Sequence, residues 1–191
     1  MKSVSVLLAV LTCLVTSCSA GITSKRATSL TAKIGTTVTQ PQTIIVTSKD
    51  NVVKLILPND WQDIWTEADQ EKWSLLVGDR ADHTQIGLRS ISKVDYPNIT
   101  PETHAQAALI AAKAPFADAE MIEEGESITV NGHRAVRYQV KGTLSGQPLV
   151  ALSLSVETPD YYHGIFVISS EQNFAQQQDE LNQIIQSLQE T

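Results

Sequence analysis

The sequence predicts an α+β domain in which an antiparallel β-sheet of about six to eight strands is flanked by two main α-helices. The chain has 191 residues, 42% of them hydrophobic, which suits one globular domain with an additional segment. Short runs rich in β-branched residues are separated by turn residues, as in antiparallel sheets. Apolar residues at helical spacing occur after the fourth of these runs and again at the end. Four strands, a helix, four strands and a final helix predict an α+β sandwich.

Four of the expected strands precede the first helix. Residues 43–47 (TIIVT) and 52–57 (VVKLIL) flank a turn-like quartet and predict a hairpin. Pro58 ends the second strand because it has no backbone N–H to donate to a ladder. Residues 73–77 and 84–92 predict two further strands, which are separated by a polar loop.

The first helix begins at a strong capping sequence. Thr100 is a good N-cap, Pro101 fits the first helical position, and Glu102 favours the positive end of the helix dipole. The helix is expected to end at Ala114-Pro115. An apolar stripe at helical spacing is formed by Ala105, Ala108, Leu109 and Ala112. These small side chains permit close packing of the helix against a sheet.

Four strands are expected after this helix. Residues 128–130 lead into Asn131-Gly132, which is a strong signal for a two-residue hairpin turn. Residues 134–143 and 150–156 alternate apolar and polar side chains, so each of these strands has one buried and one wetter face. Residues 161–169 are apolar on both faces, which predicts a central strand.

The final helix is expected to start after Ser169. Gln172 stands three residues later, so the two side chains form a capping-box pattern. One apolar stripe is formed by Phe174, Leu181, Ile184, Ile185 and Leu188. We expect this face of the helix to pack on the sheet.

The N-terminal residues predict a secretion signal. Lys2 precedes an apolar core of ten residues, 6–15, which is too short to span a membrane as a helix but typical of a signal peptide. Residues 14–18 (LVTSC) resemble a bacterial lipobox. This resemblance implies cleavage after residues 1–17 and acylation of Cys18. The alternative is an ordinary signal peptide that is cut nearby, with Cys18 removed or left free.

The lipid on Cys18 defines the expected location. Two or three acyl chains hold a protein on a membrane with negligible dissociation. By analogy with other lipoproteins, Ser19 favours the outer membrane of the bacterial envelope, with the protein facing the periplasm. Residues 18–42 then comprise the lipidated cysteine and a flexible tether, because they are rich in Ser and Thr and contain no acidic residue. The globular domain covers residues 43–191.

Charge is distributed unevenly along the chain. The formal net charge is -7 and the acidic residues all lie in the globular part. This balance argues against nucleic acid as a partner, since such binding is driven by Lys and Arg that neutralise phosphates. An acidic surface supports solubility; alternatively, it docks a basic partner or collects cations.

Short motifs in the globular part resemble the PsbP-like family. Residues 57–61 (LPNDW) are similar to its P-x-x-W sequence, and residues 131–138 (NGHRAVRY) resemble its N-G-x-x-A-x-x-Y strand entry. Residues 161–162 (YY) and 184–188 (IIQSL) are similar to its last strand and helix. Members with this fold include the extrinsic PsbP subunit of photosystem II, a Ran-binding nuclear import protein, and bacterial envelope lipoproteins such as DcrB and LpqN-like proteins. The lipobox points to the last group.

The resemblance implies a binding or accessory role and supplies no catalytic motif to match. The sequence has no nucleophile elbow, zinc-protease motif, P-loop, dinucleotide fingerprint or EF-hand loop. We therefore expect a non-enzymatic adaptor that is held on the membrane, binds another envelope protein and carries no cofactor. Two alternatives remain: a binder of a small ligand or divalent metal in a groove between sheet and helix, and an uncharacterised hydrolase.

One loop carries candidate metal ligands. Asp79, Asp82 and His83 lie within five residues, and their oxygen and nitrogen atoms are of the types that bind divalent ions. The simpler interpretation is a solvated loop, because no further ligand is evident and Arg80 lies between them.

The expected burial of the tryptophan and histidine side chains follows from their positions in the predicted strands and helices. We expect Trp61 in the core, whereas Trp65 is the better candidate for an exposed anchor at a partner surface. His163 is expected to be a core or half-buried residue of the central strand. His104 and His133 are expected at the surface.

Overall fold

The structure is a computed structural model that describes residues 42–69, 71–81 and 83–191. Within these residues there are ten strands, two α-helices and a short 3₁₀ helix at Glu67–Asp69. The strands and α-helices are β1 (Thr43–Thr47), β2 (Val53–Pro58), β3 (Trp61–Asp63), β4 (Leu75–Asp79), β5 (Thr84–Ser92), α1 (Pro101–Lys113), β6 (Glu120–Val130), β7 (His133–Leu144), β8 (Gln147–Glu157), β9 (Tyr161–Ser170), α2 (Glu171–Gln186) and β10 (Gln189–Glu190). The predicted α+β class with two main helices is confirmed.

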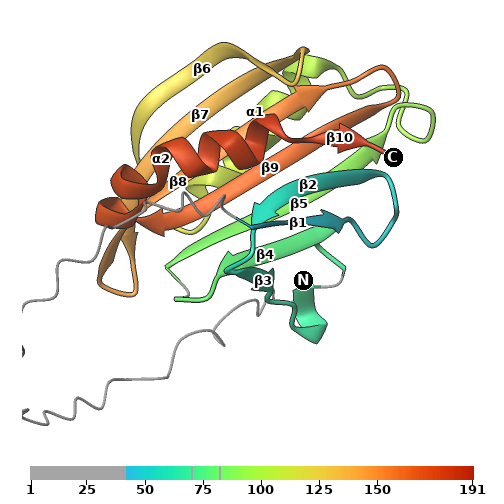
Figure 1. The fold of residues 1–191 in the computed structure, drawn as a ribbon. Helices are drawn as coiled ribbons and strands as arrows, with labels where there is room; N and C mark the ends of the chain where they lie inside the picture. The colour runs from blue at the N-terminus through green and yellow to red at the C-terminus, as the bar shows by residue number, and fades with distance from the viewer. Residues whose placement is uncertain (1–41, 70, 82) are drawn as a thin grey trace, which may run out of the picture. The chain divides into compact units, whose positions relative to one another are not determined.

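The strands form two antiparallel sheets (Figure 1). The large sheet has seven strands in the order β3-β4-β5-β9-β8-β7-β6, so β9 is central, as predicted. The small sheet has the order β1-β2-β10. The first hairpin, expected as part of one sheet, therefore belongs to a separate sheet that is closed by the last two-residue strand of the chain.

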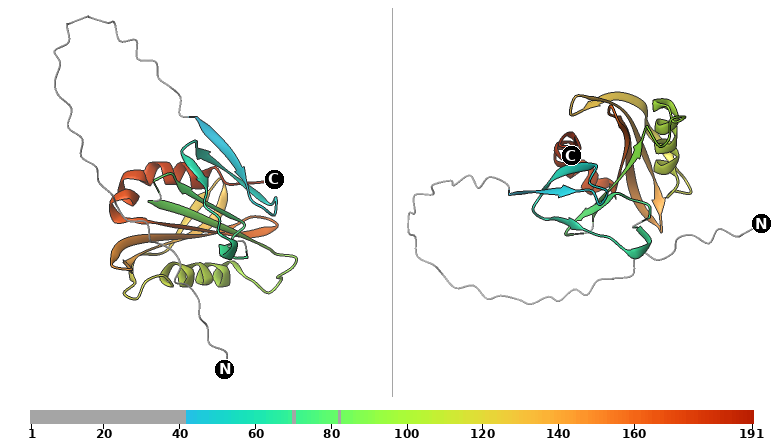
Figure 2. Two further views of the ribbon diagram at one scale, coloured as in Figure 1. Left: turned by 90° about the horizontal axis from the view of Figure 1, so that it is seen from below. Right: turned by 90° about the vertical axis from the view of Figure 1, so that its right-hand side faces the viewer.

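The two α-helices cover opposite faces of the large sheet (Figure 2). Helix α1 contacts β7, β8 and β9 on one face, whereas α2 contacts β8 and β9 on the other face together with β2 of the small sheet. The main core lies on the α2 side and includes Leu55, Ile86, Leu154 and Ile184, each no more than 2% exposed. All five apolar residues of the predicted α2 stripe are buried.

Side chains at the helix starts show why each helix begins where it does. Thr100 caps α1, since its hydroxyl accepts from the N–H of Thr103 (3.2 Å) and the Thr103 hydroxyl accepts from the N–H of Thr100 (2.8 Å). The predicted cap of α2 is wrong by one residue. Ser170 accepts from the N–H of Asn173 (3.2 Å), whereas Ser169 is buried and hydrogen-bonded within the sheet.

Two hairpin turns have the backbone that their sequences require. Asn131 and Gly132 have φ values of 44° and 82°, and Ser145 and Gly146 have values of 53° and 81°. Positive φ at both central residues is characteristic of a type I′ turn, which matches the twist of the flanking strands. The predicted turn between β6 and β7 is confirmed.

Strand β6 is longer than the predicted segment 128–130. It starts at Glu120 and pairs with β7 in a register that shifts twice, between Met121 and Glu126. The irregular part is held by side-chain ion pairs, because Arg137 contacts the carboxylates of Glu123 (2.8 Å) and Glu126 (2.5 Å). A bulged, acidic strand at the end of a sheet resists pairing with other chains.

Candidate binding site

The loop that carries the candidate metal ligands is organised by one buried carboxylate. Asp79 is 5% exposed; its Oδ1 accepts from the N–H of His83 (2.8 Å) and its Oδ2 accepts from the side chain of Gln177 (3.1 Å). These bonds close the loop and attach it to α2. His83 is exposed, and Asp82 lies outside the described residues. No metal-binding group of three or more His, Cys, Asp or Glu side chains occurs in the described part of the chain. The divalent-ion hypothesis for this loop stays a prediction.

Trp61 and Trp65 occupy different environments. Trp61 is 2% exposed, as expected for a core residue, and its Nε1–H donates to Glu180 on α2 (3.0 Å). Trp65, the predicted exposed anchor, is half-buried. The Lys49 ammonium group lies 5.4 Å from the centre of the Trp65 ring. Trp65 therefore lies beside the turn that connects β1 to β2.

Strand β1 forms a free edge of the small sheet. Ser48, which follows β1, forms a backbone hydrogen bond with β2. Gln42, which precedes β1, forms one with the residue that follows β2. Hydrogen-bonded pairs alternate along an antiparallel ladder. The backbone N–H groups of Thr43, Ile45 and Thr47 therefore point away from β2, and no described strand pairs with them.

This edge is also apolar and uncharged. Ile45 is 68% exposed and faces Ile56 on the neighbouring strand, which is 38% exposed. Strand β1 (TIIVT) contains no charged residue, in contrast to the acidic and bulged edge strand β6. Proteins commonly protect sheet edges with charges, bulges or short strands. Among the described sheet edges, β1 lacks these protections.

A cleft of about 290 Å³ lies between α1 and the large sheet. Its aromatic walls are Trp73 and Phe166, whose rings are stacked with centres 6.0 Å apart. Gly87 lies beneath the Trp73 ring, and a Cβ atom at that position would approach the ring to 2.7 Å. The absence of a side chain at Gly87 therefore allows the Trp73 ring to lie close to the sheet.

His104 also lines this cleft, which corrects the expectation that it is a surface residue. It is 7% exposed, its ring stacks on Tyr162 and its Nδ1 is hydrogen-bonded to the Ser155 hydroxyl (2.7 Å). Burial, together with the nearby His163, lowers the pKa of His104 from 6.5 to about 4. The imidazole is therefore neutral at pH 7. Because His104, Ala108 and Ala112 are spaced by four residues, the predicted α1 stripe contained the signal that His104 is buried.

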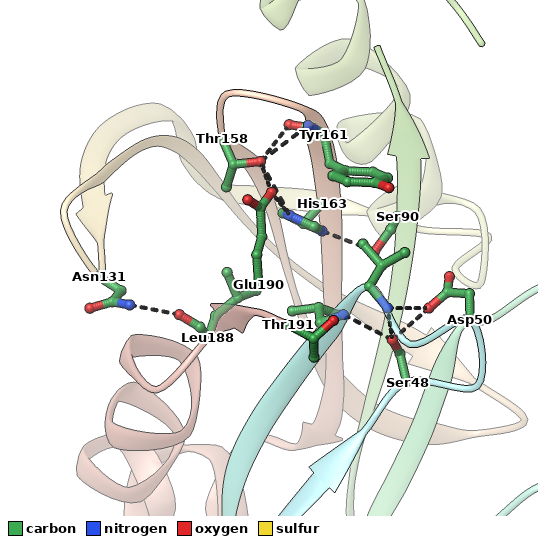
Figure 3. Close-up of polar contacts among 12 residues, drawn as sticks. Ser48, Asp50, Ser90, Asn131, Thr158, Tyr161, His163, Leu188, Glu190 and Thr191 are labelled. Atoms are coloured by element: carbon green, nitrogen blue, oxygen red, sulfur yellow. Dashed lines mark hydrogen bonds and ion pairs between the residues drawn. The ribbon is translucent and has the colours of Figure 1, made fainter. Parts of the chain in front are cut away.

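A second polar cluster surrounds His163 on the opposite face (Figure 3). His163 is fully buried; its Nδ1 is hydrogen-bonded to the Ser90 hydroxyl (2.9 Å) and its Nε2 contacts the Glu190 carboxylate (3.3 Å). Thr158 contacts both His163 and Glu190. Burial lowers the pKa of His163, while the hydrogen bond and the charge of Glu190 oppose this change. The expectation of a core histidine is confirmed, and the cluster attaches β10 to the large sheet.

Ser90, His163 and Glu190 have the residue types of a hydrolytic triad, but their environment favours a structural role. Ser90 lies inside β5, which pairs with β9 along its whole length, and its N–H donates to the Ser74 hydroxyl (3.5 Å). Hydrolysis by a serine nucleophile needs free backbone N–H groups close to the hydroxyl to stabilise the oxyanion. The N–H of Ser90 is not available for this purpose, so the geometry does not favour the hydrolase alternative.

Cys18, the predicted lipidation site, lies outside the described residues. In the described part of the chain, no helix has the length and apolar character needed to cross a membrane. No protein-family model and no curated protein matches the sequence.

Solved structures resemble the domain closely enough to define its fold. One is LpqN, which is involved in cell envelope biogenesis of Mycobacterium tuberculosis; it has a TM-score of 0.54 and 16% identity, and the alignment covers 78% of this chain and 91% of LpqN. Another is cyanobacterial PsbP (CyanoP) from Synechocystis sp. PCC 6803, with a TM-score of 0.54, 9% identity and coverage of 81% and 96%. The domain has the PsbP-like fold. The resemblance predicted from four short motifs is thereby confirmed at the level of the fold.

Two of those motifs have clear roles in the PsbP-like domain. The first motif ends β2 at Pro58 and buries Trp61 against α2. The second forms the turn at Asn131, whose side-chain amide donates to the carbonyl of Leu188 (2.9 Å). Both motifs attach α2 or its C-terminal continuation to other elements, so their residue types serve the fold.

Proposed function

We propose that the protein is a lipid-anchored component of the bacterial cell envelope and that its PsbP-like domain is a non-enzymatic adaptor. The lipobox at Cys18 and the Ser/Thr-rich tether support an anchored domain, with Ser19 favouring the outer membrane and a periplasmic orientation. The domain shares its fold with LpqN, which is involved in cell envelope biogenesis, and this is compatible with the proposed location.

The exposed edge of β1 carries the adaptor proposal. Three outward backbone N–H groups and the exposed Ile45 and Ile56 form a template for strand addition, in which an extended segment of a partner joins a sheet. The partner segment adds a strand beside β1, and its apolar side chains cover the two isoleucines. Trp65, beside the β1–β2 turn, is a second proposed contact for the same partner.

In-cell crosslinking of the full-length chain tests this proposal. A photo-crosslinking residue replaces Thr43 on the free edge of β1, and the matched control places it at the exposed Gln178 of α2. We expect one adduct of defined mass from position 43 and none from position 178. Mass spectrometry of the adduct should identify a contiguous partner segment with alternating apolar residues.

Two substitutions separate strand addition from simple proximity. Ile45→Pro removes one outward N–H without removing a bond to β2, whereas Ile45→Ala removes most of the side chain and keeps the N–H. We expect Ile45→Pro to abolish the adduct and Ile45→Ala to weaken it. A Cys18→Ala chain, released from the membrane, should lose the adduct as well. Equal adducts from both crosslinking positions, or an adduct unaffected by Ile45→Pro, would overturn the proposal.

A further inference from the structure

We infer that the cleft between α1 and the large sheet is a binding site for a small aromatic carboxylate, with one ring and a short acidic side chain. This site lies on the large sheet and is separate from the β1 edge. The cleft has a suitable size, aromatic walls, two polar side chains in its lining and a pair of cations.

The size and walls of the cleft suit a single ring. A volume of about 290 Å³ is at the small end of the range for ligand pockets. Trp73 and Phe166 offer ring faces and edges, and Ile91 adds an aliphatic surface. Aromatic pairs are favourable with ring centres about 4.5 to 7 Å apart, so a ligand ring has two partners within the cleft.

The sheet beneath the cleft is open because one position lacks a side chain. A Cβ atom at Gly164 would lie 3.8 Å from two atoms of the His104 ring and 3.9 Å from the Arg89 carbonyl oxygen. These are ordinary contact distances, so the fold itself does not require glycine here. The missing side chain leaves space in the cleft.

Two buried polar side chains line the cleft without a complete set of partners. His104 uses Nδ1 to bond Ser155, and its Nε2 has no hydrogen-bond partner among the described residues. Ser153 is 3% exposed, and its hydroxyl likewise forms no hydrogen bond within the described part of the chain. Neither atom is among the buried atoms of the described residues that lack a partner, so both are open to the cleft, where they offer hydrogen bonds to a ligand.

The charge of the cleft differs from that of the whole protein. Lys72 and Arg89 line it, and no carboxylate of the described residues does, although the net charge of the chain is -7. Neither cation forms an ion pair with a described acidic residue. An arginine guanidinium binds a carboxylate through two parallel hydrogen bonds. The ligand is therefore anionic at one end and apolar at the other.

Titration of residues 19–191 with 3-phenylpropionate tests the inference. Binding is followed by tryptophan fluorescence and by the backbone amide shifts of Phe166 and Ala108 in NMR spectra. We expect saturable binding, with 3-phenylpropanamide at least ten-fold weaker because it lacks the negative charge. Propionate, which lacks the ring, should not saturate. No saturable binding, or equal binding of the acid and the amide, would refute the inference.

Matched variants locate the site. Ala111→Leu fills the cleft from α1, whereas Ala175→Leu makes the same change at an exposed position of α2. Arg89→Gln removes the cation, and Lys54→Gln is its control on the small sheet. We expect at least ten-fold weaker binding from the two cleft variants and unchanged binding from the two controls. Thermal unfolding confirms that each variant is folded, and equal affinities in a cleft variant and its control would contradict the assignment. The titration needs no partner protein, so its outcome does not depend on the adaptor proposal.

Discussion

Replacing His104 with glutamine should change how the stability of the domain depends on pH. His104 is 7% exposed and its pKa is lowered from 6.5 to about 4, first by burial and second by the charge of His163. Between these two pH values the unfolded chain binds a proton at this position and the folded chain does not. The free energy of unfolding therefore falls as the pH decreases from about 6.5 to about 4.

The size of this effect follows from the shift itself. One pKa unit corresponds to about 1.36 kcal/mol, so a change from 6.5 to about 4 predicts a loss of about 3 kcal/mol. Below pH 4 both states are protonated and no further loss arises from His104. In His104→Gln this contribution is absent, because glutamine does not titrate. The free energy of unfolding of the protein with His104, relative to that of His104→Gln, should therefore decrease by about 3 kcal/mol from pH 7 to pH 4.

Urea unfolding of residues 19–191, followed by circular dichroism at several pH values, measures this difference. The lowered pKa of His163 acts in the same direction, but it is present in both proteins and cancels to first order in the comparison. NMR titration of the His104 ring gives its pKa directly. Parallel loss of stability in the two proteins between pH 7 and pH 4, or a ring that titrates near 6.5, would show that burial does not lower the pKa of His104.

Four further substitutions test the packing and capping of the domain, with chemical unfolding as the measurement. Gly142→Ala should lower the free energy of unfolding by about 1 to 3 kcal/mol, because a Cβ there would lie 2.6 Å from the Phe116 ring. Gly164→Ala, where a Cβ would have contacts of 3.8 Å, should leave the free energy of unfolding unchanged. Equal effects of the two substitutions would contradict the packing. Thr100→Ala should destabilise the domain by about 1 kcal/mol through loss of the α1 cap, and no change would show that the cap is dispensable. Trp61→Phe removes the indole N–H that donates to a carboxylate of α2 and leaves a smaller ring in the core. The lost hydrogen bond and the lost packing together predict a decrease of about 1 to 3 kcal/mol in the free energy of unfolding, and a neutral result would contradict both contributions.

Local patterns predicted most of the fold because most elements are defined by nearby residues. The turn at Asn131-Gly132, the cap at Thr100 and the apolar stripe of α2 each depend on residues close together in the chain. Strand β10 was missed since it has two residues and pairs with Lys54 and Val53, far away in sequence. No local propensity reports a pairing of that kind.

The binding features were less predictable because they depend on three-dimensional neighbours. That β1 is an edge strand follows from the order of the small sheet and not from its own residues. The start of β6 has low β-propensity, and its pairing relies on ion pairs with Arg137 on the next strand. The burial of His104, in contrast, was predictable from the sequence, because its spacing from Ala108 places it on the buried stripe.

The free edge of β1 is the central feature of the proposed adaptor, and amide hydrogen exchange tests that edge directly. Exchange is measured by NMR for residues 19–191 alone and with the partner segment identified by crosslinking. We predict rapid exchange at Thr43, Ile45 and Thr47 in the isolated chain and strong protection when the segment is added, while the inward amides of Ile44 and Val46 are protected in both. Outward amides that are already protected in the isolated chain, or that remain unprotected with the segment bound, would contradict strand addition at this edge.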